Sequence, residues 1–144
     1  FTPATLAVDL QGHRGARGLA PENTLAAFAR ALALGVDTLE LDTGVTSDGV
    51  VVIHHDLTLN PDIARDRHGK WLENKGPPLH SLTYAELQQY DVGRLRPATK
   101  YAGNHPYQQP VDGTRIPRLA DLFELVRQQG NQRVRFNIEI KSHP

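Results

Sequence analysis

Two carboxylates stand two residues apart in the segment TLELD, at positions 38–42. Glu40 and Asp42 alternate with Leu39 and Leu41, and in a strand this spacing places both acids on one face and both leucines on the other. Neighbouring carboxylates repel each other unless a cation lies close by. The pattern therefore has two interpretations: a solvated strand face, or a pair of oxygen ligands for Mg²⁺ or Ca²⁺, hard cations that prefer carboxylates.

The segment VRFNIEIK, at positions 134–141, alternates in the same way. Its apolar residues occupy every second position, which is the period-2 pattern of a strand with one apolar and one charged face. Glu139 and Lys141 share the charged face. Glu139 would add a third carboxylate to the acidic pair, and Lys141 would supply a cation able to contact a phosphate.

The turn GHRGARG, at positions 12–18, combines glycines with basic side chains. Glycine lets a backbone approach an anion closely, the planar fork of Arg14 suits phosphate oxygens, and His13 can transfer protons near neutral pH. The alternative interpretation is an ordinary strand-to-helix turn in which the charges are incidental.

The segment VVVIHHD, at positions 50–56, places two histidines at the end of an apolar run. A single histidine in such a place is more often structural than catalytic. Here it follows the acid-bearing strand directly, which favours catalysis, and Asp56 could orient an imidazole. We assign the catalytic role to His55 rather than His54, because His55 is the one that precedes Asp56.

The length, charge balance and cysteine content of the chain limit the classes of function. The chain has 144 residues, enough for one domain, and its 16 basic and 16 acidic side chains give no reason to expect nucleic acid as a partner. It has no cysteine for disulfides or thiolate metal sites and no apolar run long enough for stable membrane insertion. A first residue Phe1 favours an exported protein, periplasmic or secreted, over a cytoplasmic one, although a trimmed chain would begin in the same way.

The elements that must position these residues alternate between strands and helices. A short strand runs into the turn at 12–18, and Pro21 and Glu22 suit the start of a helix that Gly35 ends. Strands follow at 36–43 and 50–55, joined by the turn SDG at 47–49, which resembles a hairpin signal. The segment 57–117 is rich in Pro and Gly and carries one helix, with a capping box of Thr83 and Glu86 and a hydrophobic staple of Leu82 and Leu87. A helix with Leu119, Leu122, Phe123 and Val126 on one face and Gly130 as its end precedes the final strand.

This order predicts an α/β protein with a largely parallel sheet. Four strand ends would then supply two histidines, three acids, one arginine and one lysine. Convergence at the carboxyl ends of successive strands is typical of an active site on a (β/α) barrel.

The motifs GHRGARGLAPENT, ELD, VVIHHDLTLN and NIEIK, in this order, resemble the glycerophosphodiester phosphodiesterase family from about Gly12 to Lys141. The resemblance implies a TIM (β/α)8 barrel that hydrolyses glycerophosphodiesters to sn-glycerol 3-phosphate and an alcohol, with a divalent cation, Mg²⁺ or Ca²⁺. It implies that the metal ligands are Glu40, Asp42 and Glu139 and that the catalytic acid–base pair is His13 and His55. It also implies that Arg14 and Lys141 contact the phosphate, with Glu22 and Asn23 in a supporting role. The chain departs from the family pattern at the adjacent His54 and His55, and at Asn60 and Pro61, where the family often has Arg-Thr; the second departure marks a subgroup.

A TIM barrel takes roughly 250 residues. We therefore expect the whole chain, 1–144, to form the N-terminal half of one barrel domain, with a loop-rich insertion at about 57–117. An open half barrel would expose an edge and apolar faces, which predicts self-association into a homo-oligomer or low stability. The expected partner is a small-molecule glycerophosphodiester; the alternatives are a non-catalytic phosphate- or glycerol-binding fragment and a phospholipase D-like lipid phosphodiesterase, against which the polar insertion argues.

Overall fold

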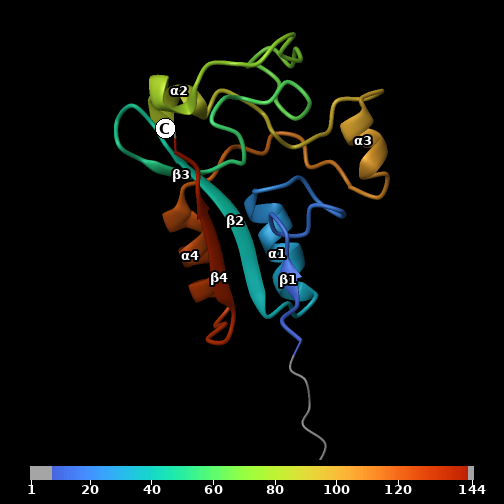
Figure 1. The fold of residues 1–144 in the computed structure, drawn as a ribbon, viewed down its shortest axis with the longest axis vertical. Helices are drawn as coiled ribbons and strands as arrows, with labels where there is room; N and C mark the ends of the chain where they lie inside the picture. Colours follow the sequence, from blue (N-terminus) through green and yellow to red (C-terminus); the bar gives the residue numbers. More distant parts are fainter. Residues whose placement is uncertain (1–7, 143–144) are drawn as a thin grey trace, which may run out of the picture.

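The computed structural model describes residues 8–142 (Figure 1). Its helices and strands in chain order are β1 (Gln11–Gly12), α1 (Leu25–Ala33), β2 (Thr38–Val45), β3 (Val51–Ile53), the 3₁₀ helix η1 (Leu79–Ser81), α2 (Tyr84–Leu87), α3 (Lys100–Asn104), α4 (Leu119–Gln128) and β4 (Arg135–Ile140). The predicted α/β class and order are confirmed. The segment between β3 and α4 holds two elements that the sequence did not indicate, η1 and α3, so the prediction of a single helix there is wrong.

The strand β2 is the centre of the sheet. Thr38 pairs with Gln11 of β1 and with Arg135 of β4, both in parallel, whereas Thr43 pairs with Ile53 of an antiparallel β3. Thr43 also pairs with β4, so β4 runs along one edge of β2 while β1 and β3 share the other edge. The largely parallel sheet is confirmed, but β3 is not a successive parallel strand.

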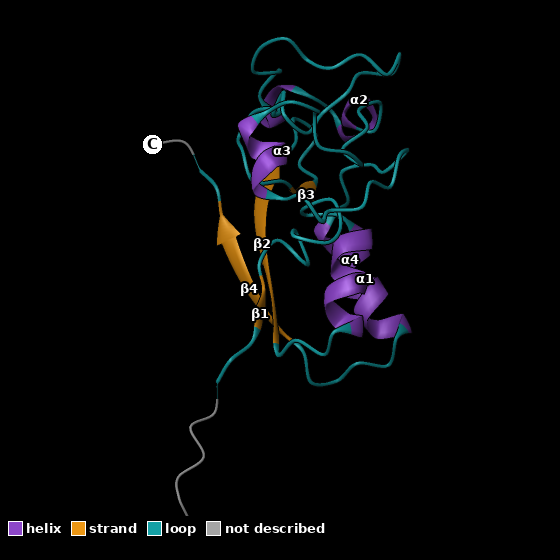
Figure 2. Ribbon diagram, turned by 90° about the vertical axis from the view of Figure 1, so that its right-hand side faces the viewer, coloured by secondary structure: helices purple, strands orange, loops and turns teal. Residues whose placement is uncertain are grey.

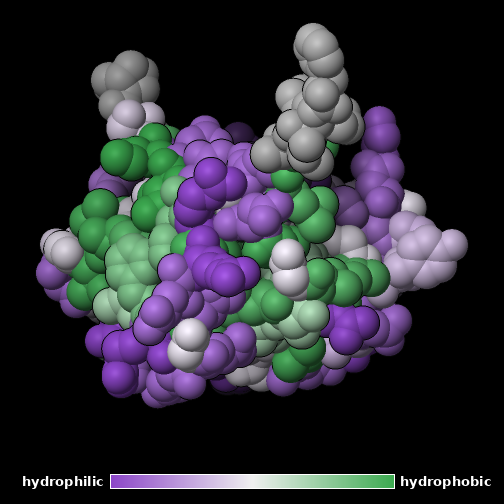
Figure 3. Space-filling view, turned by 90° about the horizontal axis from the view of Figure 1, so that it is seen from below, coloured by the Kyte–Doolittle hydropathy of each residue, from purple (hydrophilic) through white to green (hydrophobic). Residues whose placement is uncertain are grey.

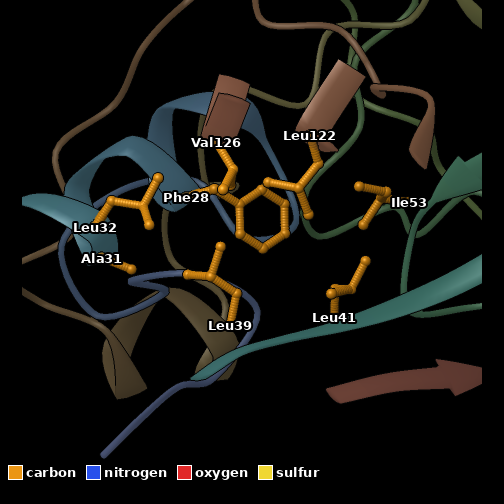
Figure 4. Close-up of a cluster of buried hydrophobic side chains, with 8 residues drawn as sticks. All are labelled: Phe28, Ala31, Leu32, Leu39, Leu41, Ile53, Leu122 and Val126. Atoms are coloured by element: carbon orange, nitrogen blue, oxygen red, sulfur yellow. The ribbon is translucent and has the colours of Figure 1, made fainter. Parts of the chain in front are cut away.

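One face of this sheet is covered by α1 and α4, which gives two layers (Figure 2). Leu39 and Leu41 of β2 are fully buried against Phe28 of α1 and Leu122 of α4 (Figure 4). Burying a large apolar side chain stabilises a fold by about 1.5–3 kcal/mol, so the leucine face of β2 anchors the strand. The opposite face, with Glu40 and Asp42, is left for polar chemistry.

The ends of α1 and α4 differ in part from the prediction. Helix α1 begins at Leu25 rather than near Pro21, because the side chain of Thr24 caps it by accepting a hydrogen bond from the Ala27 amide. Gly35 follows its end with a φ of 76°, as predicted. On α4, Leu122 is buried but Phe123 is 42% exposed, and its ring lies edge-on to that of Phe136 at 5.0 Å, so its assignment to the buried face is wrong.

The insertion packs around a second apolar cluster, which joins Val52 of β3 to six residues of the insertion: Leu59, Ala64, Leu79, Leu87, Val92 and Ile116. The predicted capping box of α2 is present: the Glu86 amide donates to the Thr83 hydroxyl, and the Thr83 amide donates to the Glu86 carboxylate. Leu82 and Leu87, the predicted staple, both pack in the cluster. The insertion is thereby an ordered cap above the carboxyl end of β2 (Figure 1).

The surface seen from below carries both hydrophobic and hydrophilic patches (Figure 3). Across residues 8–142 the most exposed large apolar side chains include Val8, Ile140 and Tyr107, which are 83%, 79% and 76% exposed. Within the same range, no helix combines the length and the apolar character that a membrane crossing requires.

Candidate active site

Three carboxylates meet where β2 and β4 lie side by side. The register pairs Asp42 directly with Glu139, and Glu40 lies two residues before Asp42 on the same strand face. One oxygen from each of the three acids can be chosen so that all lie within 4.8 Å of one another. The parallel pairing of β2 with β4 thus converts two separate alternating segments into one acidic cluster.

Asp42 is the most buried of the three, with a side chain only 1% exposed. Its Oδ2 accepts a hydrogen bond from Asn23 Nδ2 at 3.0 Å. Burial raises the pKa of Asp42, but the hydrogen bond from Asn23, the nearby imidazole of His55 and the contact with Lys141 outweigh it, so the pKa lies below its usual value. The carboxylate is therefore held ionised, as a metal ligand must be.

Two cations flank the acidic cluster. Lys141 Nζ lies 3.3 Å from Asp42 Oδ1 and also contacts Glu139. Arg14 Nε lies 3.6 Å from Asp42 Oδ2, and the Arg14 backbone amide donates to Glu40 Oε2 at 2.8 Å. The site thus places positive charge on both sides of the acids, where phosphate oxygens could be bound.

His13 follows β1 and reaches the same place. Its Nε2 lies 3.8 Å from Glu40 Oε2, and its Nδ1 lies 3.0 Å from an Arg17 guanidinium nitrogen. Because a guanidinium can only donate, Nδ1 must accept that hydrogen bond. The ring proton is therefore on Nε2, toward the acidic cluster.

His55 arrives by a different route from the predicted one. Because β3 runs antiparallel to β2, the chain returns toward Asp42, and the His54 amide donates to the Asp42 carbonyl. Two expectations met at this strand: the hairpin signal at 47–49 is confirmed, whereas the arrival of His55 at the carboxyl end of a successive parallel strand is wrong, because β3 is antiparallel. Its Nδ1 donates to Asp56 Oδ1 at 2.8 Å, which leaves Nε2 available, and Asn60 Nδ2 holds the other carboxylate oxygen at 2.7 Å.

Known proteins are similar to this chain in sequence and in fold. Residues 13–144 match the Glycerophosphoryl diester phosphodiesterase family. The chain belongs to this family of enzymes. A glycerophosphodiester phosphodiesterase of Caldanaerobacter subterraneus subsp. tengcongensis is 37% identical over 130 residues, which are 90% of this chain and 44% of that protein.

Solved structures agree with the family assignment. One from Silicibacter pomeroyi superposes with a TM-score of 0.91 at 42% identity, over 96% of this chain and 46% of that chain. A phosphodiesterase of Oleispira antarctica, solved in complex with the product sn-glycerol-3-phosphate, has a TM-score of 0.66 at 30% identity, over 93% and 44% of the two chains. The chain therefore spans less than half the length of these three relatives.

His54, the first of the two adjacent histidines in the VVIHHD segment of this phosphodiesterase-family chain, lies in the interior. It is 2% exposed, and burial lowers the pKa of its ring, which keeps the ring neutral. A side chain so enclosed has no surface to offer a substrate. The choice of His55 over His54 as the candidate catalyst agrees with this placement.

Sequence reasoning missed three residues that border the site. Arg17 contacts His13, Asn60 fixes Asp56, and Tyr101 of α3 reaches the Arg14 side chain from the insertion. Arg17 lies four residues from His13 in the same turn, so a contact between the two side chains could have been predicted. Nothing local in the sequence placed Tyr101 there.

A cavity of about 650 Å³ opens beside His55 and is also lined by Lys75 and Lys141.

Two glycines of the turn at 12–18, Gly12 and Gly15, are required by packing against their neighbours. Gly15 has a φ of +80°, and a Cβ there would lie 2.8 Å from the backbone carbon of Ala27. A Cβ on Gly12 would meet the Gly15 carbonyl oxygen at 2.8 Å. Both residues let the turn sit directly on α1, which fixes where His13 and Arg14 point.

We expect Gly15→Ala to destabilise the fold by about 2–4 kcal/mol, because it adds left-handed backbone strain and overpacking against α1. Gly18→Ala is the matched control, since Gly18 has no atom within 4 Å of an added Cβ. Urea unfolding of both variants measures the difference. Equal midpoints for the two would contradict the packing role of Gly15.

Proposed function

We propose that the protein hydrolyses glycerophosphodiesters to sn-glycerol 3-phosphate and an alcohol. The carrying observation is the convergence of three carboxylates, two imidazoles and two cations from β1, β2, β4 and the β3 hairpin. Family membership and the product bound in the Oleispira antarctica relative support the same reaction. Because the chain spans under half of its relatives, we also propose that its sheet is the N-terminal part of a (β/α)8 barrel.

The acidic cluster fits a hard divalent cation. Glu40, Asp42 and Glu139 would hold it, since carboxylate oxygens are the ligands that Mg²⁺ and Ca²⁺ prefer. When bound, the ion would neutralise charge that develops on the phosphoryl oxygens. Arg14 and Lys141 would contribute to the same neutralisation and orient the phosphate.

The two histidines would move the protons. One imidazole removes a proton from the attacking hydroxyl, whether of water or of the substrate's own glycerol, and the other donates one to the leaving alkoxide. His55 is suited to either step because Asp56 fixes its ring and leaves Nε2 available. His13 presents Nε2 next to Glu40, and the His55 ring lies close enough to Asp42 to influence its charge, so both imidazoles lie near the acidic cluster.

The test is an assay of the purified protein on glycerophosphocholine before and after treatment with EDTA. We expect turnover that falls more than about 10²-fold on chelation and returns with Mg²⁺ or Ca²⁺, since the ion supplies much of the charge stabilisation. Turnover that persists in excess EDTA would contradict the metal-dependent mechanism. Substrate binding without any turnover would favour the non-catalytic alternative.

A further inference from the structure

Helix α3 lies over the turn that carries His13 and Arg14. Two hydrogen bonds hold the following residues to that turn: Gln108 Nε2 donates to the Arg17 carbonyl at 2.7 Å, and the Gln109 amide donates to the Leu19 carbonyl at 3.0 Å. Thr99 caps the helix through its hydroxyl. A distant part of the insertion is therefore fixed against the candidate active site.

The Tyr101 hydroxyl connects this helix to three charged side chains. Its oxygen accepts from Nη1 of Arg14 at 3.5 Å and of Arg17 at 3.4 Å, and its proton is donated to the Glu22 carboxylate. A phenol has one donor and two acceptor positions, so all of its hydrogen-bonding capacity is used. Burial and the Glu22 charge raise the pKa of Tyr101 to about 12, so the hydroxyl keeps its proton at neutral pH.

The partners of Tyr101 lead directly to reactive groups. Arg17 uses its other terminal nitrogen to donate to His13 Nδ1 at 3.0 Å. Glu22 in turn accepts from Arg14 Nη1 at 2.8 Å, and Arg14 Nε faces Asp42 at 3.6 Å. The Tyr101 hydroxyl thus begins two series of contacts. One ends at the imidazole of His13, a candidate catalyst, and the other at Asp42, a candidate metal ligand.

We propose that Tyr101 is a positioning residue that fixes Arg17, and through it the ring orientation and tautomer of His13, while holding Glu22 and Arg14 toward the acidic cluster. The proposal deepens the proposed function and rests on it for its kinetic consequence. The insertion then acts as a part of the active site and not only as its cover.

The first test compares Tyr101→Phe with Tyr107→Phe, an exposed tyrosine in the same segment. Tyr101→Phe keeps the ring and its edge-on contact with His105 at 5.1 Å, so it should still fold. We expect kcat on glycerophosphocholine to fall about 10- to 100-fold, the range for residues that orient active-site groups without touching the substrate. The change in KM should be smaller. Tyr107→Phe should match the wild type.

A double variant separates positioning from a general structural effect. Because Tyr101 acts partly through Arg17 and partly through Glu22 and Arg14, the loss of turnover in Tyr101→Phe combined with Arg17→Ala should be smaller than the product of the two single losses. Multiplying losses in the double variant would overturn the proposed route through Arg17.

The deciding measurement is independent of turnover. Nitrogen NMR of the metal-free protein, with the His13 signals assigned from His13→Gln, reports which ring nitrogen carries the proton. We expect the Nε2–H tautomer in the wild type and in Tyr107→Phe, and a mixture of tautomers in Tyr101→Phe. Unchanged His13 signals in Tyr101→Phe would overturn the proposal. An inactive wild type with the expected NMR change would instead contradict only the proposed reaction.

Discussion

Replacing His13 or His55 with alanine is expected to lower turnover of a glycerophosphodiester by more than about 10²-fold, because general acid–base catalysis contributes roughly 10²–10⁴-fold. Arg17 holds Nδ1 of His13, and Asp56 holds Nδ1 of His55. In each ring Nε2 is therefore available to transfer a proton. Alanine offers no group that could transfer a proton in either step.

The fold should survive both substitutions. The side chains of His13 and His55 are 56% and 33% exposed, so removing them opens no enclosed cavity. His68→Ala is the matched control, because this histidine is exposed in a turn of the insertion. Steady-state kinetics, with circular dichroism to check folding, compares the three variants. Near-normal turnover in a folded His13 or His55 variant would show that its imidazole is not a catalytic group.

The parts of the fold that sequence predicted well are those governed by local pattern. The alternation around Glu40 and Glu139 predicted β2 and β4, because a strand must turn successive side chains to opposite faces. The capping box of Thr83 and Glu86 predicted α2 from two residues three apart. The meeting of the three acids was expected from strand ends that converge on one site, whereas the direct pairing of β2 with β4 comes from the structure.

The route of His55 was indicated by the hairpin signal at 47–49, but the barrel interpretation treated its strand as a successive parallel one. The turn at 47–49 is too short for the crossover that a parallel strand requires, which takes a dozen or more residues. A tight turn joins antiparallel strands, so β3 had to return alongside β2. This return strand brings the chain beside Asp42, and the catalytic role of His55 stays a prediction.

The contribution of Tyr101 was beyond local reasoning. Helix α3 is five residues long and contains a glycine, so it has no periodic pattern to detect. Its position depends on how the whole loop 88–118 packs, including Gly93, where a Cβ would lie 1.9 Å from the Val111 carbonyl oxygen. Such contacts join residues far apart in the chain and are set by tertiary structure alone.

Asp42→Asn is expected to lower turnover by about 10²–10³-fold, the range for losing one preorganised electrostatic group. Asp42 is the buried member of the acidic cluster and the one that both Arg14 and Lys141 approach. The neutral amide keeps the shape and can still pair with Asn23, but it cannot supply negative charge to a hard cation. Kinetics at a fixed Mg²⁺ or Ca²⁺ concentration measures the loss.

A second readout of the same variant does not depend on activity. An ion that binds only the folded protein raises its unfolding temperature, so the wild type should unfold at a higher temperature with Mg²⁺ or Ca²⁺ than with EDTA. This increase should be lost in Asp42→Asn and retained in Glu73→Gln, which changes an exposed acid of the insertion by the same chemistry. If Mg²⁺ or Ca²⁺ raised the unfolding temperature of Asp42→Asn as much as that of the wild type, the ion would bind elsewhere. In this variant only Glu40 and Glu139 of the acidic cluster keep a charge, and its most buried ligand is neutral.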